Sequence, residues 1–189
     1  MTRPGRSFFE RDPQICAREL IGCLFQWGDS AGLIVETEAY AEHGDEACHT
    51  FFRPSARDFV SRNPAGTAYV YLNYGMYWLT NVLCINPQTG NNGFVLLRAL
   101  EPVQGISIMQ KRRNKTKLTD LCSGPGKLSM ALGIGKTDHG TDIADCFHPG
   151  KELPVAADRR IGISRAQELE WRFLEAGNPH LSVPFGKAK

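Results

Sequence analysis

The chain has 189 residues, of which 42% are hydrophobic and 22% charged, and its formal net charge is +2. This composition is typical of one globular domain with a hydrophobic core of its own, spanning residues 1–189. The small charge is no evidence for a polyanionic partner, and no apolar run is long enough to span a bilayer. Residues 1–5 lack the apolar stretch of a secretory signal, so we expect a soluble, cytoplasmic protein with no membrane partner.

The spacing of the six cysteines argues against a zinc site. No two form a Cys-x-x-Cys pair, and no combination of Cys and His has the spacing of zinc ligands. Several lie inside apolar runs, so we expect buried, reduced thiols, no metal and no cofactor. Cys48 and His49 could form a nucleophile and its base, but neighbouring side chains on an extended chain point to opposite faces.

The first part of the chain predicts one short helix and two strands. Asp12-Pro13 is typical of an N-cap followed by proline at the first helical position, in a helix that continues to about Leu20. The apolar run 23–27 suits a strand, and residues 33–40 alternate as a half-buried strand does. Residues 41–66 have no periodicity, which predicts a long functional loop.

The middle of the chain predicts a protruding hairpin. Residues 67–73 and 76–83 are expected as its strands, because Asn73-Tyr74-Gly75 has the composition of a hairpin turn. Residues 93–100 form a third apolar strand. A helix is then expected to begin at Glu101-Pro102 and to continue into a run of basic residues.

Helices and short strands are mixed in the remainder. Residues 123–132 are expected as a turn and a helix that ends at Gly133, and residues 165–171 as another helix. Short strands are expected around Ile161 and Ser182. The fold class is therefore α+β, with a curved, largely antiparallel sheet and short surrounding helices.

Two carboxylates are expected on one face of the strand 33–40. Alternation places Glu36, Glu38 and Tyr40 together, with the glutamates roughly 7 Å apart. One interpretation is an exposed face, or acids paired with arginines, because unpaired buried charge is costly. The other is a general base for water, with Arg98 at the end of an apolar strand keeping a glutamate ionised and holding the water.

Aromatic rings are crowded into the same part of the chain. Most strand tyrosines are ordinary sheet packing, but Tyr74 at the hairpin tip cannot easily bury itself in its own core. Tyr74 is therefore a candidate wedge that enters a base stack and holds it open. His49 could fold back over the same site. The rings are Tyr40, Tyr69, Tyr71, Tyr74, Tyr77 and Trp78.

Two features could contact phosphates. A basic cluster with no acid among its members consists of Lys111, Arg112, Arg113, Lys115 and Lys117. Such clusters are usually solvated faces, but the aromatic strands favour a nucleic-acid contact here. Gly124-Pro-Gly-Lys127 lacks the spacing of a Walker A loop, although glycines with a lysine at a helix start can meet a phosphate.

Several blocks match one known family in order and at near-family spacing. The blocks are Glu36-Thr-Glu-Ala-Tyr40 with His49, Tyr69-Val-Tyr71, Tyr74-Gly-Met-Tyr77 with Asn81, Val95-Leu-Leu-Arg-Ala-Leu-Glu-Pro102 and Leu121-Cys-Ser-Gly-Pro-Gly-Lys-Leu128. Together they resemble the alkyladenine (3-methyladenine) DNA glycosylase family, from the first helix to about Ile163. The resemblance implies an enzyme that flips a damaged purine nucleotide out of double-stranded DNA and hydrolyses its N-glycosidic bond.

The resemblance also implies roles for single residues. Glu38 would be the general base for the attacking water, and Glu36 would support it. Arg98 would position the water, and the backbone carbonyl of Ile161 would add a third contact. The residues implied for the base pocket are Tyr40, His49, Tyr71, Asn81 and Leu96.

In that pocket Tyr40 and His49 would stack on one face of the base and Tyr71 on the other. Asn81 would crowd a purine 2-amino group and so disfavour normal guanine. An alkylated purine is positively charged, so it stacks well and leaves easily. One glutamate can then be enough for lesions such as 3-methyladenine, with deaminated and ethenylated purines as further candidates.

The remaining implied contacts are with the duplex. Tyr74, with Met76, would fill the gap left by the flipped nucleotide, and Lys127, Arg112 and Arg113 would contact the DNA backbone. No lysine in the pocket segments invites a Schiff base, so we expect a monofunctional enzyme that leaves an abasic site. A monomer with no obligate protein partner is expected.

The chain departs from the family pattern after His49. There the family has a loop with an Arg-Asn pair and a Met-Phe pair. In residues 51–63 Arg57-Asp58 takes the place of the first pair and the second is missing. The departure affects how the loop supports His49, and Phe94 lies where it would narrow the pocket.

Two alternatives stay open. A DNA- or RNA-binding module without catalysis would use the rings and the basic cluster but would not need Glu38 or Arg98. A hydrolase or transferase acting on free nucleosides would not need Tyr74.

Overall fold

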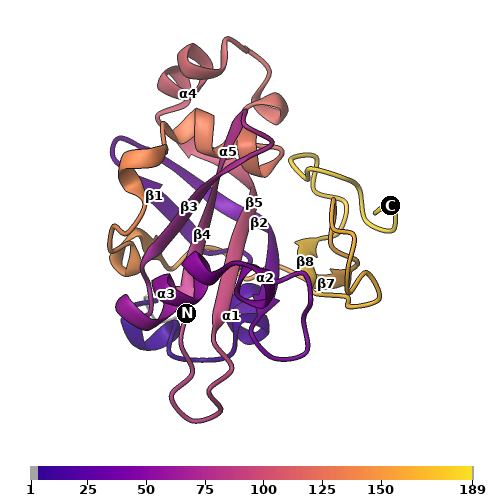
Figure 1. The fold of residues 1–189 in the computed structure, drawn as a ribbon. Coiled ribbons are helices and arrows are strands. Elements are labelled where there is room, and N and C mark those ends of the chain that lie inside the picture. Colours follow the sequence, from indigo (N-terminus) through magenta and orange to yellow (C-terminus); the bar gives the residue numbers. More distant parts are fainter. Residues whose placement is uncertain (1–3, 189) are drawn as a thin grey trace.

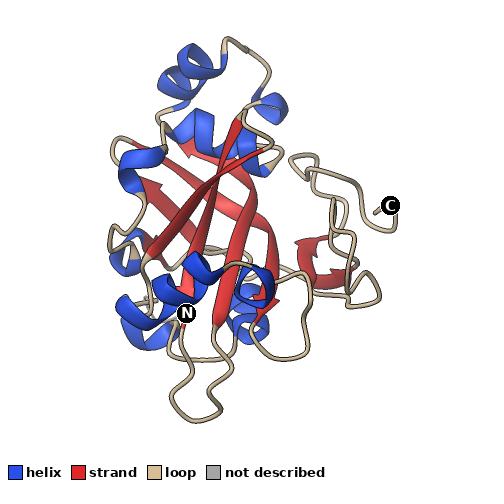
Figure 2. Ribbon diagram, viewed as in Figure 1, coloured by secondary structure: helices blue, strands red, loops and turns tan. Residues whose placement is uncertain are grey.

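One eight-stranded antiparallel sheet, which is not closed into a barrel, forms the centre of the computed structural model, which describes residues 4–188 (Figure 1). The strand order is β3-β4-β5-β2-β1-β6; β8 pairs with β2, and β7 pairs with β8. Helices lie above and below the sheet in the view of Figure 2. The predicted α+β class is confirmed.

The strands are of very unequal length. The two longest, β2 and β5, have twelve residues each and pair along most of their length. The bounds are β1 Leu24–Trp27, β2 Ser30–Ala41, β3 Ala68–Asn73, β4 Tyr77–Cys84, β5 Gly93–Gln104, β6 Phe147–His148, β7 Val155–Asp158 and β8 Arg172–Glu175.

The helices are short and cover the ends of the sheet. Their bounds are α1 Pro13–Glu19, α2 His49–Phe52, α3 Pro54–Arg62, α4 Ile106–Arg113 and α5 Pro125–Leu132. Within residues 4–188, none has the length and apolar character that crossing a membrane would take.

Local signals placed several elements correctly. Proline is at the first helical positions of α1 and α5, and α5 ends at Gly133, whose φ of 77° suits glycine. The hairpin turn is also confirmed: Tyr74 and Gly75 both have positive φ, and the Met76 N–H donates to the Asn73 carbonyl at 3.0 Å.

The predicted loop 41–66 was wrong, because it contains α2 and α3. Pro54 is the first residue of α3, and the helix buries Ala56 and Phe59, three residues apart on one face. These residues join Cys48, Tyr69, Leu83 and Phe94 in a small second core. The helices therefore form a wall beside β3–β5, which holds His49 next to the sheet.

The predicted helix start at Glu101-Pro102 was also wrong, because β5 continues to Gln104. Pro102 pairs with Gly32 next to a register shift, a position where a strand tolerates a residue without an N–H. The turn into α4 is made by Gly105, whose φ is 69°.

The predicted helix 165–171 and the strands around Ile161 and Ser182 do not form. This region instead contains the β7–β8 pair, and the rest is irregular chain, seen in yellow and orange in Figure 1. Ala166 has a φ of 47°, and its carbonyl accepts a hydrogen bond from the Arg160 side chain. The positive φ of Ala166 is incompatible with a continuous α-helix at this point.

The main hydrophobic core lies between the sheet and helices α1, α4 and α5. Phe9, Phe25 and Phe147 are fully buried there and pack ring against ring at 4.9–5.0 Å. Cys146 is half-buried and the other five cysteines are buried. This core fixes β2 and β5, the two strands that supply the site.

Candidate functional site

Two glutamates of β2 and one arginine of β5 meet in a buried cluster. Arg98 Nε donates to Glu36 Oε1 at 2.9 Å, and Arg98 Nη1 lies 3.1 Å from Glu38 Oε2. Both carboxyl groups are 0% exposed. The register passes from Glu36–Ala99 to Thr37–Leu97, which leaves Arg98 without a partner in β2. A bulge of this kind re-aims a side chain, and here it places the guanidinium between the two acids.

Glu36 is the more heavily bonded acid. Arg172 Nε donates to its Oε1 at 2.8 Å, and Ser182 donates from its backbone N–H and from Oγ, both at 2.6 Å. Burial alone would raise the pKa of Glu36, but Arg98, Arg172 and the Ser182 bonds outweigh burial and lower it below its usual value. Glu36 is therefore a charged anchor for two arginines.

Neither Arg172 nor Ser182 was predicted as a site residue. Arg172 is fully buried and also donates to Asp158 Oδ2 at 2.9 Å and to the Val183 carbonyl. The sequence does carry one signal for Arg172, because it is a charged residue inside the apolar run 171–174. Through these bonds the irregular segment after β8 is attached to the floor of the site.

Glu38 is held by three groups. The Ile161 N–H donates to Oε1 at 2.7 Å, and the Tyr40 hydroxyl donates to Oε2 at 2.8 Å, beside Arg98. Ile161 thus contacts Glu38 through its backbone N–H, whereas the sequence suggested a role for its carbonyl. Burial would lower the pKa of Arg98, but Glu38 and Glu36 outweigh burial and raise it, so the guanidinium stays charged.

A cavity of about 630 Å³ adjoins this cluster. All five residues predicted for the base pocket line it: Tyr40, His49, Tyr71, Asn81 and Leu96. Arg98, Ile161 and Tyr74 line it as well, whereas Glu38 does not. Its volume falls within the range of about 300–1,000 Å³ typical of small-ligand sites.

The sheet register explains why residues far apart in sequence meet at this cavity. Tyr69 pairs with Asn81 between β3 and β4, and Asn81 pairs with Leu96 between β4 and β5. Leu96 in turn pairs with Glu38 between β5 and β2. Paired residues project from the same face, so this row forms a continuous floor. Asn81 is fixed by donating to the Tyr69 carbonyl at 3.0 Å.

The rings of His49 and Tyr71 are in contact, with centroids 4.5 Å apart at an interplanar angle of 60°. A flat ring between two others needs about 7 Å between them, twice the contact distance of carbon atoms. No base therefore fits between His49 and Tyr71 as they lie here. His49 Nδ1 is 3.0 Å from the Tyr69 hydroxyl, and Tyr69 stacks on Phe94 at 4.4 Å, so Phe94 is part of the wall.

The hairpin tip projects from the molecule beside the cavity. Tyr74 is 81% exposed and Met76 is 66% exposed, although both are large apolar side chains. Tyr74 also lines the cavity mouth, whereas Met76 does not. An exposed aromatic on a two-residue turn can enter a neighbouring molecule at little cost in its own packing.

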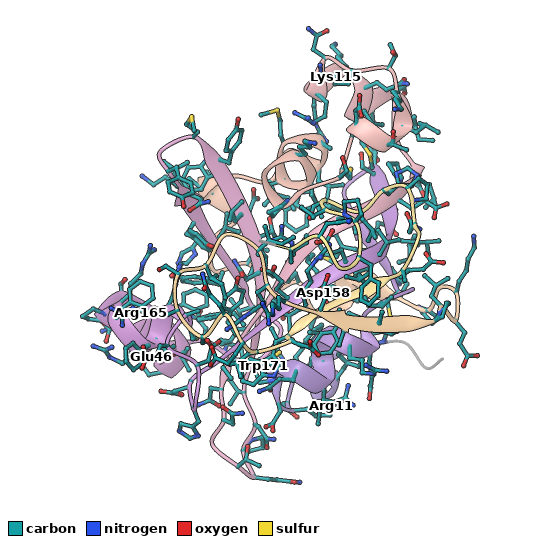
Figure 3. The ribbon with its side chains drawn as sticks, turned by 90° about the vertical axis from the view of Figure 1, so that its right-hand side faces the viewer. Arg11, Glu46, Lys115, Asp158, Arg165 and Trp171 are labelled. Carbon is teal, nitrogen blue, oxygen red and sulfur yellow. The ribbon has the colours of Figure 1, made fainter. Side chains whose placement is uncertain are left out.

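The basic cluster is only partly free to meet a phosphate. Arg112 donates to the carbonyls of Ala131 and Leu132 at the end of α5, at 3.2 and 2.8 Å. Arg113 donates to the Leu121 and Asp120 carbonyls. Figure 3 shows Lys115 on a protruding part of the chain, well apart from Glu46 and Arg165. Lys127 is exposed at the start of α5.

A second buried ion pair lies behind the cavity wall and was not predicted. Arg160 forms a bidentate pair with Asp45 at 2.6 and 2.7 Å and donates to the Ala39 carbonyl at 2.9 Å. Its Cζ lies 4.7 Å from the centroid of the Tyr40 ring. The pair connects the loop 42–48, which follows β2, to the segment that begins at Ile161. Arg160 also supports one face of the Tyr40 ring.

Two cations at the cavity, the half-buried Arg53 and the exposed Arg165, were not predicted either. Arg53 lies 5.6 Å from the Tyr71 ring centroid. Arg165 lies 3.7 Å from Glu46, and Figure 3 shows this pair side by side. Arg53, Arg165 and Glu46 all line the cavity.

Cys48 and His49 do not form a nucleophile and base. Burial raises the pKa of the Cys48 thiol to about 11, and burial together with Arg53 lowers the pKa of His49 to about 4. His49 lies against Tyr69 and Tyr71 instead. Within residues 4–188, no group of three or more His, Cys, Asp or Glu side chains could hold a metal ion.

The fold and the site define a class: proteins with an aromatic-lined cavity of ligand size next to a buried pair of carboxylate and guanidinium. Comparison with known proteins makes the class more specific. The family model for methylpurine-DNA glycosylase (MPG) matches residues 7–179. The chain belongs to this family of DNA glycosylases, which act in base excision repair.

Curated relatives agree over nearly the full chain. A protein of Rhizobium etli is 44% identical over 95% of this chain and 89% of its own length. One of Rhodopseudomonas palustris is 43% identical over 95% and 88%, and one of Chlorobaculum tepidum is 39% identical over 96% and 91%. Each carries the name "Putative 3-methyladenine DNA glycosylase".

Proposed function

We propose that this protein flips alkylated or deaminated purine nucleotides out of duplex DNA and removes the base by hydrolysis, which leaves an abasic site. The observation that carries the proposal is the position of Glu38. Its carboxylate is held by Arg98, Tyr40 and the Ile161 N–H directly behind the wall of an aromatic cavity of about 630 Å³. The names of the curated relatives support 3-methyladenine as one substrate base.

In the proposed reaction Glu38 is the general base and Arg98 positions the attacking water. A proton leaves water, the water oxygen bonds to C1′ of the sugar, and the electron pair of the C1′–N bond goes to the purine. An alkylated purine is already cationic, so it leaves as a neutral base without an acid catalyst. The described residues that line the cavity include no lysine, which supports a monofunctional hydrolase over a Schiff-base enzyme.

In the proposed complex the base stacks on Tyr40 and Tyr71, with Asn81 against the purine 2-position. Because His49 and Tyr71 touch in the free protein, their rings have to separate by about 2.5 Å to admit a base between them. The four-residue helix α2 carries His49, and its Phe51 and Phe52 are both 50% exposed. A movement of α2 is therefore the cheapest way to open the pocket.

Extrusion of the nucleotide is assigned to the hairpin tip. Tyr74 would occupy the gap in the duplex, with Met76 beside it, while Lys127 contacts the DNA backbone. Arg112 and Arg113 are assigned a weaker share of that contact, because their guanidinium groups already bond to protein carbonyls. Flipping costs a few kcal/mol, and least for a damaged or mispaired base. The protein is proposed to act as a monomer.

The two alternatives have less support. A binding module has no use for Glu38 and Arg98, which are buried at high desolvation cost. A hydrolase of free nucleosides has no use for Tyr74, which is exposed at the cavity mouth.

The test uses a duplex oligonucleotide with one hypoxanthine or ethenoadenine, followed by heating in alkali to cut abasic sites. Wild type is expected to yield a break at the lesion. Glu38→Gln is expected to bind the duplex and release no base, whereas Glu152→Gln, an exposed residue in an irregular segment, should behave as wild type. No break across a panel of methylated, ethenylated and deaminated purines would favour the binding module. Turnover of small nucleosides, with no higher rate on duplex DNA, would favour the hydrolase of free nucleosides.

A further inference from the structure

The charges that line the cavity do not balance. Within residues 4–188, they are three guanidinium groups and one carboxylate. Arg98 lies 3.1 Å from the buried Glu38, and Arg165 lies 3.7 Å from Glu46. Arg53 is the third guanidinium, and no acid in the described part of the chain pairs with it. The cavity therefore has one positive charge without a counter-charge.

Arg53 lies among the rings of the cavity. It directly follows α2 and is half-buried, and its Cζ lies 5.6 Å from the centroid of the Tyr71 ring. Burial lowers the pKa of His49 to about 4, and the Arg53 charge adds to that lowering. Burial raises the pKa of Tyr69 and of Tyr71, and the Arg53 charge opposes both rises. Three groups of the cavity wall thus sense this charge, so a base that occupies the cavity has to sense it as well.

The charge on the leaving purine depends on the lesion. When the C1′–N bond breaks, its electron pair goes to the purine. An alkylated purine that enters the cavity as a cation becomes neutral. Hypoxanthine enters neutral and becomes an anion, until it takes a proton from water. A fixed cation beside the base therefore opposes the entry of the first kind of base and stabilises the departure of the second.

We propose that Arg53 is a specificity-determining residue that favours the removal of neutral damaged purines, because its guanidinium stabilises the negative charge that develops on the departing base. The inference rests on the proposed glycosylase function. Cationic lesions stay substrates because they leave easily, but the same charge weakens their binding. His49 cannot duplicate this role, because its low pKa keeps it neutral near pH 7.

The test separates binding from the chemical step for one lesion of each kind, hypoxanthine and 3-methyladenine in duplex DNA. Single-turnover base release is measured at increasing protein concentration, which gives a saturating rate and a half-saturating concentration. Arg53→Gln should lower the saturating rate on hypoxanthine about tenfold and change its half-saturating concentration less than about threefold. On 3-methyladenine it should lower the half-saturating concentration about tenfold without lowering the saturating rate. Arg53→Lys keeps the charge and should stay within about threefold of wild type on both lesions.

The matched control is Arg62→Gln, which removes the same charge from the neighbouring helix α3. Arg62 is exposed and does not line the cavity, so this variant should match wild type on both lesions. Thermal unfolding checks that each variant is folded. If Arg53→Gln does not fold, Arg53→Met removes the charge while it keeps an unbranched stem, and the same two shifts are expected of it.

The outcomes separate this role of Arg53 from the function on which it rests. Arg53→Gln that stays within about threefold of wild type on both lesions would overturn the role and leave the glycosylase function intact. Equal losses on both lesions, with the salt dependence of duplex affinity reduced by about one unit of slope, would show that Arg53 contacts a phosphate instead and would also overturn it. Wild-type protein that releases neither base would overturn both proposals.

Discussion

Substitution by glutamine should have different main effects at the two neighbouring glutamates of β2: a loss of stability at Glu36 and a loss of base release at Glu38. Glu36 accepts four hydrogen bonds, two of them from the buried guanidinium groups of Arg98 and Arg172 and two from Ser182. In Glu36→Gln an amide nitrogen replaces one oxygen, and both arginines lose their shared counter-charge. Removal of one partner from a buried ion pair costs about 3–5 kcal/mol.

Glu38 loses less on the same change. It accepts from Tyr40, Arg98 and the Ile161 N–H, and Arg98 keeps its bond to Glu36. One bond to a charged group is worth about 1.5–3 kcal/mol. Glu38→Gln should therefore destabilise the fold by about half as much as Glu36→Gln while it abolishes base release.

The assay combines thermal unfolding with single-turnover excision. For a chain of this length about 1 kcal/mol corresponds to 2–4 °C, so Glu36→Gln should lower Tm by about 6–20 °C. It should retain measurable base release at a temperature where it is folded, because Glu38 is intact. Equal losses of Tm for the two variants, or a Glu36→Gln protein as stable as wild type, would refute this division of roles.

Three further outcomes follow from the same contacts. Tyr74→Ser should change stability by less than about 0.5 kcal/mol because the side chain is 81% exposed, yet slow excision from duplex at least about fivefold more than from single strands; equal slowing on both would count against the wedge. The pKa of His49 is lowered from 6.5 to about 4, so the unfolded chain binds the extra proton first. Stability should hold above pH 6.5 and decline as the pH falls toward 4, and His49→Gln should flatten that decline in urea titrations. Lys127→Ala should reduce the salt dependence of DNA affinity by about one unit of slope with little change in Tm, whereas Arg112→Ala should cost about 1–3 kcal/mol of stability, because its bonds to the end of α5 are lost. A drop in Tm for Lys127→Ala like that of Arg112→Ala would contradict this distinction.

The sequence predicted those parts of the site that depend on local pattern. Strand alternation brought Glu36, Glu38 and Tyr40 to one face, and turn composition put Tyr74 at a hairpin tip. These features need only a few neighbouring residues for their definition. The register of β2, β4 and β5 then places Asn81 and Leu96 in one row with Glu38.

The supporting residues could not be predicted in the same way. Arg172 and Ser182 bond to Glu36 across 136 and 146 residues, and Arg160 bonds to Asp45 across 115. No periodicity records such a partner. The helix expected at 165–171 does not form. The Ala166 carbonyl accepts from the Arg160 side chain, and the Trp171 carbonyl accepts from the distant Ala39 N–H of β2. For α2 and α3 the signal is present in Pro54 and in the spacing of Ala56 and Phe59, but the lack of periodicity over residues 41–66 as a whole predicts a loop.

The attachment of Ser182 and Val183 to the acid cluster gives the order in which the protein can mature. Both residues follow β8, so a growing chain can complete all eight strands while Glu36 still lacks the Ser182 hydroxyl and backbone N–H. Such an intermediate has the complete sheet but lacks the two hydrogen bonds that Ser182 donates to Glu36. The hydrogen bonds of Glu36 are thus completed after the framework has assembled. A chain shortened before residue 182 should fold with lower stability and, because the partners of Glu38 all precede residue 182, still release a damaged base.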